Sequence, residues 1–450
     1  MKKIVLFCVI WSVSVPSSSA DLMNIFQQAL DNDNIYQQAV LETLSQKEDV
    51  AISRAYLLPN AQLNTQPLVS GQSNSGAIVP EIQPPRNTFR SYEMNLSLTQ
   101  PIFNFALFSR YKTSKISARV ALAHLNSELQ ELMLRVTEAY FNVLRSEKRV
   151  TYLKSNKKAL AQQLQDVQHK LKAGKTTQSY VYIAQSSYSA AQSDLLSAET
   201  QLDADKEYLT ELTATDDTRL ADLNRRFPLV SPQPQSQNKW LQKALENNWA
   251  IKANQLQLQV AREKIKQTYS DHMPVINAKL IYDNNGFHYT QSSLIVAAGS
   301  SRMQNSTAML DVKIPIFSGG LVVASTRKAQ QHFKIAQQKL DHSLRQVRSH
   351  VHNSYRNVIV NIKKIHYQSD AIHSAEQSLK GLKERYTSGS GNLTDVLAQQ
   401  ANLLKAQMNY ETARYDYVIS LLQLKKASGV LATQDLITIN QWLHQSTKSV

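Results

Sequence analysis

The sequence predicts a mostly helical protein with a small β part, built from two internal repeats. Three observations support this class. Two long tracts, 102–227 and 316–450, contain no proline, and a proline in a helix interior costs about 3 kcal/mol or more. Landmark residues recur in the same order at a fixed interval along the chain. Short segments in which polar and apolar residues alternate precede each tract, as in strands with one wet face.

The repeats are recognised from landmarks that return at one constant spacing, which we term the repeat interval. They are Ala29-Leu30 with Ala244-Leu245, Pro59 with Pro274, Tyr140-Phe141-Asn142-Val143 with Tyr355-Arg356-Asn357-Val358, Gly174 with Gly389 and, displaced by one position, Pro101-Ile102-Phe103 with Pro315-Ile316-Phe317. A period of this length indicates a duplicated domain rather than a short solenoid unit. We predict a first repeat over 21–237, which ends in a linker, and a second over 238–450, which ends in a C-terminal equatorial segment.

Residues 1–20 predict a secretory signal peptide. Lys2 and Lys3 form a basic start, an apolar run covers 4–15, and small residues precede Ala20. An uncleaved membrane anchor is the alternative, but the run is short for a span of about 20 residues. No other stretch approaches about 18 apolar residues, so we expect the exported chain to be either soluble outside the cytoplasm or embedded as a β-barrel.

Composition excludes several classes of protein. The 450 residues include 42% hydrophobic ones, 11 Gly and 12 Pro, which excludes collagen, a disulfide scaffold and wholesale disorder. The single cysteine, Cys8, lies in the predicted signal peptide, so the mature chain offers no thiol nucleophile and no Cys-ligated metal. The formal charge of +15 is spread along the predicted helices without a dense basic cluster. We therefore expect general solvation and no nucleic-acid partner.

The proline and glycine pattern predicts six helices. Their expected ranges are 22–57, 105–171, 176–212, 240–272, 318–386 and 392–428. Each of the two longest would measure about 100 Å at about 1.5 Å per residue. In each repeat the two shorter helices sum to nearly the length of the long one, so they can lie along it end to end. Gly174 and Gly389 are expected where helices reverse, because glycine adopts the left-handed backbone readily.

Heptad spacing on the shorter helices predicts packed seams. Alternating steps of three and four positions connect Val181, Ala184, Tyr188, Ala191, Leu195, Ala198 and Leu202, and, one repeat interval later, Val396, Gln399, Leu403, Ala406, Tyr410, Ala413 and Tyr417. The many alanines allow close approach of helices. We interpret this stripe as core packing rather than as a cofactor site, and we predict no cofactor.

Alternating segments predict four strands, two in each repeat. The clearest are 92–99 and 307–314, and 61–69 and 275–283 alternate more loosely. A half-buried sheet in a water-soluble domain gives the same alternation. We favour membrane strands for three reasons. The segments are close to the length of about 9–11 residues that a strand needs to cross a membrane. One face carries Glu, Asp and Lys, as the water-filled lumen of a barrel would, and the stretches 71–90 and 285–305 are rich in Gly, Ser, Asn, Gln and Pro, as exposed loops are.

Four strands cannot close a barrel, and lipid does not tolerate open sheet edges. Membrane strands therefore require several chains to pool their sheets. Two chains would give eight strands with a filled interior, whereas three would give twelve strands and room for a lumen. The sequence thus predicts an oligomer and favours at least a trimer.

An enzyme finds little support. The sequence has no His-Glu-x-x-His, no Walker loop and no Gly-x-Ser-x-Gly. His342, His350, His352, His366 and His373 mostly lack the spacing of three or four that helical metal ligands need. The run Gly389-Ser390-Gly391 lacks the preceding strand of a dinucleotide loop. We predict no catalytic residue and no metal site.

Taken together, the chain resembles the TolC-type outer-membrane efflux or secretion channels over about residues 21–440. Motifs that carry the resemblance are Leu58-Pro59, Met273-Pro274, Gln100-Pro101-Ile102-Phe103, Ile314 to Gly320, and the hairpin tips around Gly174 and from Gly389 to Leu397. The resemblance implies a homotrimer. Its twelve strands would form a transmembrane β-barrel in outer-membrane lipid, continuous with a long antiparallel α-helical barrel in the periplasm.

The same resemblance implies passive conduction of exported drugs, as in multidrug efflux, or of proteins, as in type I secretion. An inner-membrane pump of the RND, ABC or MFS type would supply the energy. A periplasmic adaptor (membrane fusion protein) would dock at the hairpin tips, here Gly174, Lys175, Gly389, Ser390 and Gly391. The alternative is a soluble periplasmic coiled-coil adaptor or scaffold, which would explain the helices but not the strands.

Two residues match the family's periplasmic gate. Asp395 matches a position whose carboxylates ring the closed mouth, and its alternative role is to cap the helix that starts near Asn392. Tyr386 matches a tyrosine that tethers the inner helix pair to its neighbour, with ordinary packing as its alternative.

Three positions depart from the family's gate pattern. A possible second acid falls at Ala398, the basic residue near the tip falls at Gly391, and the acidic partner of the tether falls at Tyr180. We therefore expect the contacts that hold the periplasmic gate closed, which we term the latch, to differ from those of the family pattern.

Overall fold

The computed structural model describes residues 20–72, 87–216, 219–289 and 299–443. The predicted signal peptide with Cys8 lies outside the described residues, apart from Ala20. Two compact units form, one from 1–40, 125–249 and 344–450, and one from 41–124 and 250–343. Each unit thus takes stretches from both halves of the sequence.

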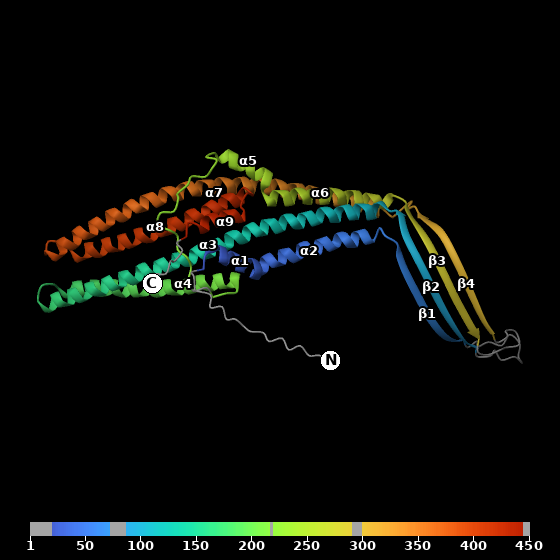
Figure 1. Ribbon diagram of the computed structural model, residues 1–450, viewed down its shortest axis with the longest axis horizontal. Coiled ribbons are helices and arrows are strands. Elements are labelled where there is room, and N and C mark those ends of the chain that lie inside the picture. The colour runs from blue at the N-terminus through green and yellow to red at the C-terminus, as the bar shows by residue number, and fades with distance from the viewer. Residues whose placement is uncertain (1–19, 73–86, 217–218, 290–298, 444–450) are drawn as a thin grey trace, which may run out of the picture. The chain divides into compact units, whose positions relative to one another are not determined.

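The helices follow the chain in the order shown in Figure 1. They are α1 (Leu22–Asn32), α2 (Asn34–Ala55), α3 (Phe105–Lys172), α4 (Gln178–Thr213), α5 (Gln237–Asn247), α6 (Trp249–Tyr269), α7 (Leu321–Thr387), α8 (Leu393–Ala427) and α9 (Thr433–Asn440), with a 3-10 turn at Ser270–His272. α3 and α7 have 68 and 67 residues. Among the described residues, none of the helices is both long and apolar enough to cross a bilayer.

Two predicted helices are each broken in two, which corrects the ranges 22–57 and 240–272. At the first break, the Asp33 amide donates to the carbonyl of Ala29 at 2.8 Å, and its carboxylate accepts the amide of Tyr36 at 2.6 Å. At the second, Asn248 takes an extended backbone with ψ 124. Asp33 and Asn248 are one repeat interval apart, so both repeats break at the same place.

The predicted heptad seams are confirmed. Ala184, Ala191, Leu195 and Ala198 of α4 are buried, and so are Val396, Ala406, Ala413 and Tyr417 of α8. The remaining heptad positions are half-buried. α9 is a helix that the sequence did not predict; its Leu436 and Ile439 are buried.

Aromatic side chains fill the core of the first unit. Tyr140, Phe141 and Tyr415 are fully buried, with the Phe141 and Tyr415 rings stacked 5.5 Å apart. The Tyr140 hydroxyl donates to the carbonyl of Ala221 at 2.6 Å. Burial raises the pKa of Tyr140. The α3 core therefore holds the segment that links the two repeats.

The second unit holds one antiparallel sheet in the order β1-β2-β3-β4. Its strands are β1 (Asn60–Gln72), β2 (Asn87–Phe103), β3 (Val275–Tyr289) and β4 (Gly299–Lys313). They are longer than predicted, because 71–72, 87–90, 285–289 and 299–305 pair instead of looping. The rest of the predicted loops, 73–86 and 290–298, lies outside the described residues.

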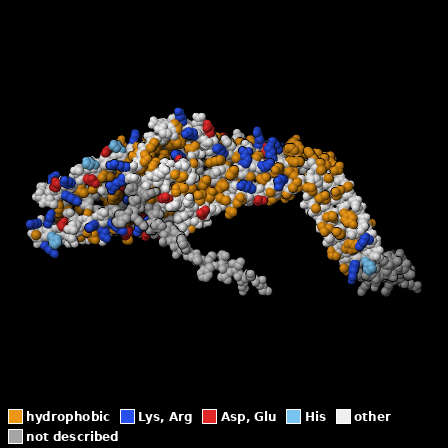
Figure 2. Space-filling view, viewed as in Figure 1, with side chains coloured by type: hydrophobic (Ala, Val, Ile, Leu, Met, Phe, Trp, Pro, Cys, Tyr) orange, Lys and Arg blue, Asp and Glu red, His pale blue; other side chains and the backbone are white. Residues whose placement is uncertain are grey.

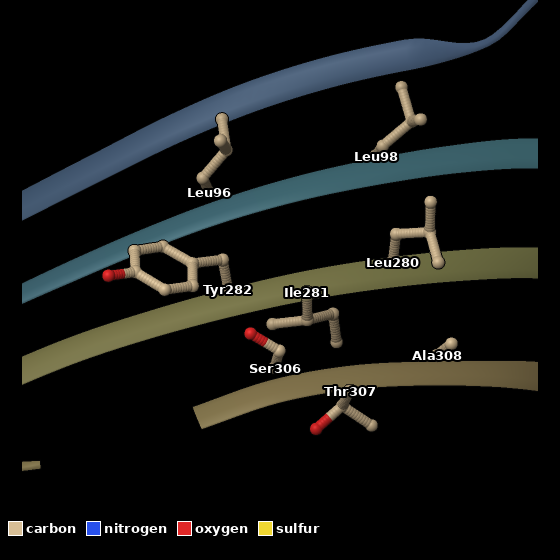
Figure 3. Close-up of a pocket in the computed structure, with 8 residues that line it drawn as sticks. All are labelled: Leu96, Leu98, Leu280, Ile281, Tyr282, Ser306, Thr307 and Ala308. Atoms are coloured by element: carbon tan, nitrogen blue, oxygen red, sulfur yellow. The ribbon is translucent and has the colours of Figure 1, made fainter. Parts of the chain in front are cut away.

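Register divides the sheet into an apolar face and a polar face. The apolar face carries Ala61, Leu63, Leu96, Leu98, Ile276, Ala278, Leu280, Tyr282, Ala308, Leu310 and Val312, and the polar face carries Gln62, Asn64, Gln66, Glu93, Asn95, Lys279, Asp283, Asn285, Asp311 and Lys313. Figure 3 shows the side chains of Leu96, Leu98, Leu280 and Tyr282 beside one another. They line part of an open hollow of about 400 Å³. Leu63 is 56% exposed and Leu310 69%, so the single chain leaves this face uncovered.

Candidate functional site at the hairpin tips

Both helical hairpins reverse by the same backbone device. Gly174 has φ +66 and Gly389 has φ +82. The Lys175 amide donates to the carbonyl of Lys170 at 2.8 Å, and the Ser390 amide donates to that of Arg385 at 3.0 Å. These i to i−5 bonds around a left-handed residue form a Schellman-type helix end. The two predicted turn glycines are therefore required by the backbone itself.

Gly391 is a second kind of glycine, needed for close approach. A Cβ at this position would stand 2.9 Å from the backbone nitrogen of Tyr386 and 3.0 Å from the carbonyl carbon of Arg385. Neither atom can move without shifting the last turn of α7. The space explains why a basic side chain is absent here, although the family resemblance leads one to look for it.

A small apolar core, which we term the tip cluster, joins the two hairpins near their ends. Its buried members are Leu164, Val167, Ala184 and Leu393, and Tyr180, Val181, Tyr188, Tyr386 and Leu397 pack against them. These residues come from α3, α4, α7 and α8. Both Val167 and Leu393 are fully buried. Burial of aliphatic side chains here stabilises the contact by about 1.5–3 kcal/mol for each large residue.

Tyr386 connects the second hairpin to the first. The ammonium nitrogen of Lys170 lies 4.0 Å from the centre of the Tyr386 ring. A cation over an aromatic face contributes about 0.5–2 kcal/mol, depending on desolvation. Tyr180, at the place of the expected acidic partner, packs against the tip cluster instead. The sequence analysis did not predict the cation–π contact between Lys170 and Tyr386.

Asp395 lies in the first turn of α8 and is exposed. The cap of that helix is the side chain of Asn392, whose oxygen accepts the amide of Thr394 at 3.1 Å. Asp395 pairs with no cation in the part of the chain that the structure describes. Ala398, one turn later, is exposed as well. The first turn of α8 therefore presents one exposed carboxylate, that of Asp395.

A ladder of polar pairs continues the α3–α8 contact away from the tip. Its steps are Asn156 with Gln400 at 2.9 Å, Tyr152 with Glu411 at 3.3 Å, Arg145 with Asp416 at 2.5 Å, Glu138 with Gln423 at 3.0 Å, and Glu131 with Lys426. Positions fall along α3 as they rise along α8, so the helices run antiparallel. The sequence analysis missed the ladder, because pairing depends on a register that no single helix reveals.

Arg414 is the one cation of this region that is almost fully buried, among the described residues. It pairs with Glu411 at 2.5 Å and donates to the carbonyls of Leu223 and Asn224 at 2.9 and 2.8 Å. Arg414 therefore connects the inter-repeat segment to α8.

The same Glu411 carboxylate lies beside Tyr152. Burial and this carboxylate raise the pKa of Tyr152 to about 12.

Comparison with known proteins shows the family. A sequence model of the family described as outer membrane efflux protein matches the chain twice, over residues 25–215 and 240–430. The chain belongs to this family. The starts of the two matches are separated by the same repeat interval that the landmarks revealed, so the duplication and the family agree.

Relatives and solved structures agree with this membership. The chain is 27% identical over 453 residues to the outer membrane protein TolC of Vibrio cholerae, and the match covers 100% of both. It is 25% identical over 417 residues to the alkaline protease secretion protein AprF of Pseudomonas aeruginosa, covering 92% of this chain and 85% of AprF. The fold matches the Campylobacter jejuni CmeC outer membrane channel with a TM-score of 0.76 at 15% identity, over 99% and 98% of the two chains.

Family membership gives the parts of the molecule their setting. The protein is an outer-membrane channel of the efflux and secretion class, and its helical part lies in the periplasm. The sheet has one apolar face and one polar face, which is the pattern of strands that stand between lipid and a water-filled lumen. The predicted family resemblance and fold class are confirmed.

Proposed function

We propose that three copies of the chain form one passive conduit for exported cargo. The observation that carries the proposal is the sheet, which has one uncovered apolar face, one polar face and two open edges. Within the described strands, β1 and β4 each pair on one side only. Open edges cannot stand in lipid, and twelve strands enclose a lumen whereas eight do not.

The polar face supports conduction of hydrophilic or charged cargo. Asn95 donates to Asp283 at 2.6 Å, and Lys279 pairs with Asp311 at 2.7 Å. These cross-strand contacts keep charges of both signs on the wall without a large field of one sign. A wall of this kind admits varied solutes, so the selectivity for cargo would reside in the pump.

The helical hairpins would receive the partners. We propose that a periplasmic adaptor docks at Gly174, Lys175, Gly389, Ser390 and Gly391, and that an inner-membrane pump supplies the energy. All of these except the half-buried Gly391 are exposed. AprF is named a secretion protein for a protease, which makes protein cargo a candidate beside small drugs. No catalytic step is proposed for this family of transport proteins.

Gating would occur at the same tips. Asp395 from each of three copies would ring the periplasmic mouth, and focused carboxylates in a narrow channel favour cations. Tyr386 on Lys170 would hold the hairpins of each copy together in the closed state. The runner-up function, a soluble adaptor or scaffold, has no place for the membrane sheet.

Planar-bilayer recording tests the proposal. Purified protein should insert and conduct with cation preference, and Asp395→Asn should lose most of that preference in the closed channel. Asp194→Asn, an exposed aspartate on α4, is the matched control and should leave selectivity unchanged. Absence of any conductance from correctly inserted protein would reject the channel, whereas unchanged selectivity of Asp395→Asn would reject only the gate.

A further inference from the structure

A cationic group stands at one end of the apolar face of the sheet. Arg90 on β2 pairs in register with His288 on β3, and the next row on the same face pairs Tyr92, Gly286 and Arg302. In Figure 2, blue and pale blue side chains gather at this end of the sheet, beyond the orange ones. Every other charged side chain of the described strands lies on the polar face. Among the described strands, the apolar face therefore carries only positively charged side chains, and these lie in two neighbouring rows.

The group is positioned by local packing. Arg302 donates from Nε to the Tyr92 hydroxyl at 3.0 Å. The Tyr92 ring lies so close over Gly286 that a Cβ there would stand 2.2 Å from Cε1. Arg302 thus keeps its two terminal amino groups available. An open hollow of about 480 Å³ lies here, and its lining includes Arg90, Tyr92, Gly286, His288, Ser300 and Arg302, with Ser91, Phe287 and Ser301 between them.

The height of the group matches a lipid headgroup. From the row of Ile276, near the helical end of β3, to the row of Gly286, the strand rises about 34 Å at about 3.4 Å per residue. With the strand tilted by about 40°, this rise corresponds to a height of about 26 Å along the bilayer normal. An outer-membrane barrel has an apolar band about 25 Å tall. Arg302 and Arg90 thus lie at and just beyond the edge of that band.

Chain connectivity identifies the leaflet. β2 ends at Phe103 and α3 begins at Phe105, whereas Arg90 lies near the opposite end of β2. Because the helices are periplasmic, the cationic end of the sheet faces the cell exterior. The lipid at that level belongs to the outer leaflet, whose main component in such membranes is a glycolipid with phosphate monoesters on its sugars.

We propose that Arg90, His288 and Arg302 bind the phosphate groups of this outer-leaflet glycolipid, lipid A. The inference rests on the proposed membrane orientation of the sheet. Guanidinium groups bind phosphate through two parallel N–H donors. Tyr92 adds an amphipathic ring at the interface, where tyrosine is enriched. Each copy of the chain carries one complete site, because all its residues come from β2, β3 and β4.

The test is lipid binding by purified channel in detergent, followed by native mass spectrometry. Lipid A with its phosphates should bind, and dephosphorylated lipid A should bind at least about tenfold more weakly, as expected for loss of charge-assisted hydrogen bonds. The double variant Arg90→Gln/Arg302→Gln should show a loss of the same size. Lys313→Gln removes one cation from the polar face of the same sheet and should bind as the unmodified channel does.

Separate outcomes decide the inference. Equal binding of the two lipids, or full binding by the double variant, would overturn it, and so would inorganic phosphate at equal concentration displacing lipid A. Arg302→Lys keeps the charge but loses the fork, so it should bind between the two extremes even if the double variant fails to assemble. The same spectra report the oligomer. A trimer that ignores lipid A would reject only the lipid site, whereas absence of a trimer would reject the proposed channel.

Discussion

Replacing Lys170 by Met removes the ammonium group from the face of Tyr386 while the side chain keeps its unbranched apolar stem. The ring and the cation lie 4.0 Å apart, and both residues are half-buried. A contact in such surroundings contributes about 1 kcal/mol. Three copies of the latch would then contribute about 3 kcal/mol if they add, which corresponds to an increase of about 150-fold in the ratio of open to closed channels.

The assay is single-channel recording of open probability, arranged as a double-mutant cycle. Lys170→Met and Tyr386→Leu should each raise the open probability, and the double variant should open little more than either single one. Lys172→Met is the matched control, since Lys172 is also in the last turn of α3 but is exposed. Equal opening of the Lys170 and Lys172 variants, or full additivity in the cycle, would refute the latch.

Three further predictions concern stability. Arg414→Met should lower the free energy of unfolding by about 3–5 kcal/mol, because Glu411 stays buried without its cation, and Arg414→Met/Glu411→Leu should regain part of the loss in thermal melts. Gly391→Ala should destabilise the tip by about 1–3 kcal/mol, because the new Cβ would contact the backbone of Tyr386. Gly381→Ala, which has open space around its Cβ, should stabilise α7 by up to about 1 kcal/mol. Equal midpoints of urea unfolding for the two variants would contradict this prediction. Above pH 10 the folded state should lose stability. Burial raises the pKa of Tyr152 to about 12 in the folded state, so the unfolded chain releases this proton first as the pH rises. The stabilisation that protonated Tyr152 provides below pH 10 should therefore be lost by about pH 12. Tyr152→Phe should flatten that part of the stability curve in circular dichroism, and an unchanged slope would exclude Tyr152 as its source.

The large elements were predictable because proline and glycine mark where long helices must stop. The breaks at Asp33 and Asn248 were not predicted, because aspartate and asparagine interrupt a helical pattern less strongly than proline does. Asp33 acts as a cap only because its carboxylate accepts the amide of Tyr36. The strand ends were missed because polar and small residues there pair with a neighbouring strand, and composition alone resembles that of a loop.

The site was predictable only in part. Gly174 and Gly389 are visible in the sequence because a helical reversal needs a left-handed residue. Lys170 is one of many lysines in a helical tract, and its contact with Tyr386 exists only once two distant hairpins meet. The group of Arg90, His288 and Arg302 likewise requires the register of three strands, of which β2 and β3 are far apart in sequence.

The central claim is that three copies close one barrel through β1 of one copy and β4 of the next. Oxidative cross-linking tests it directly, because Cys8 lies in the predicted signal peptide and the mature chain has no other cysteine. Asn64→Cys on β1 would be combined with a cysteine placed in turn at Asn305, Thr307 and Met309 on the polar face of β4. At the matching register, denaturing gels should show a ladder that ends at three chains. Cross-links confined to single chains, or a ladder that stops at two or runs past three, would contradict the account.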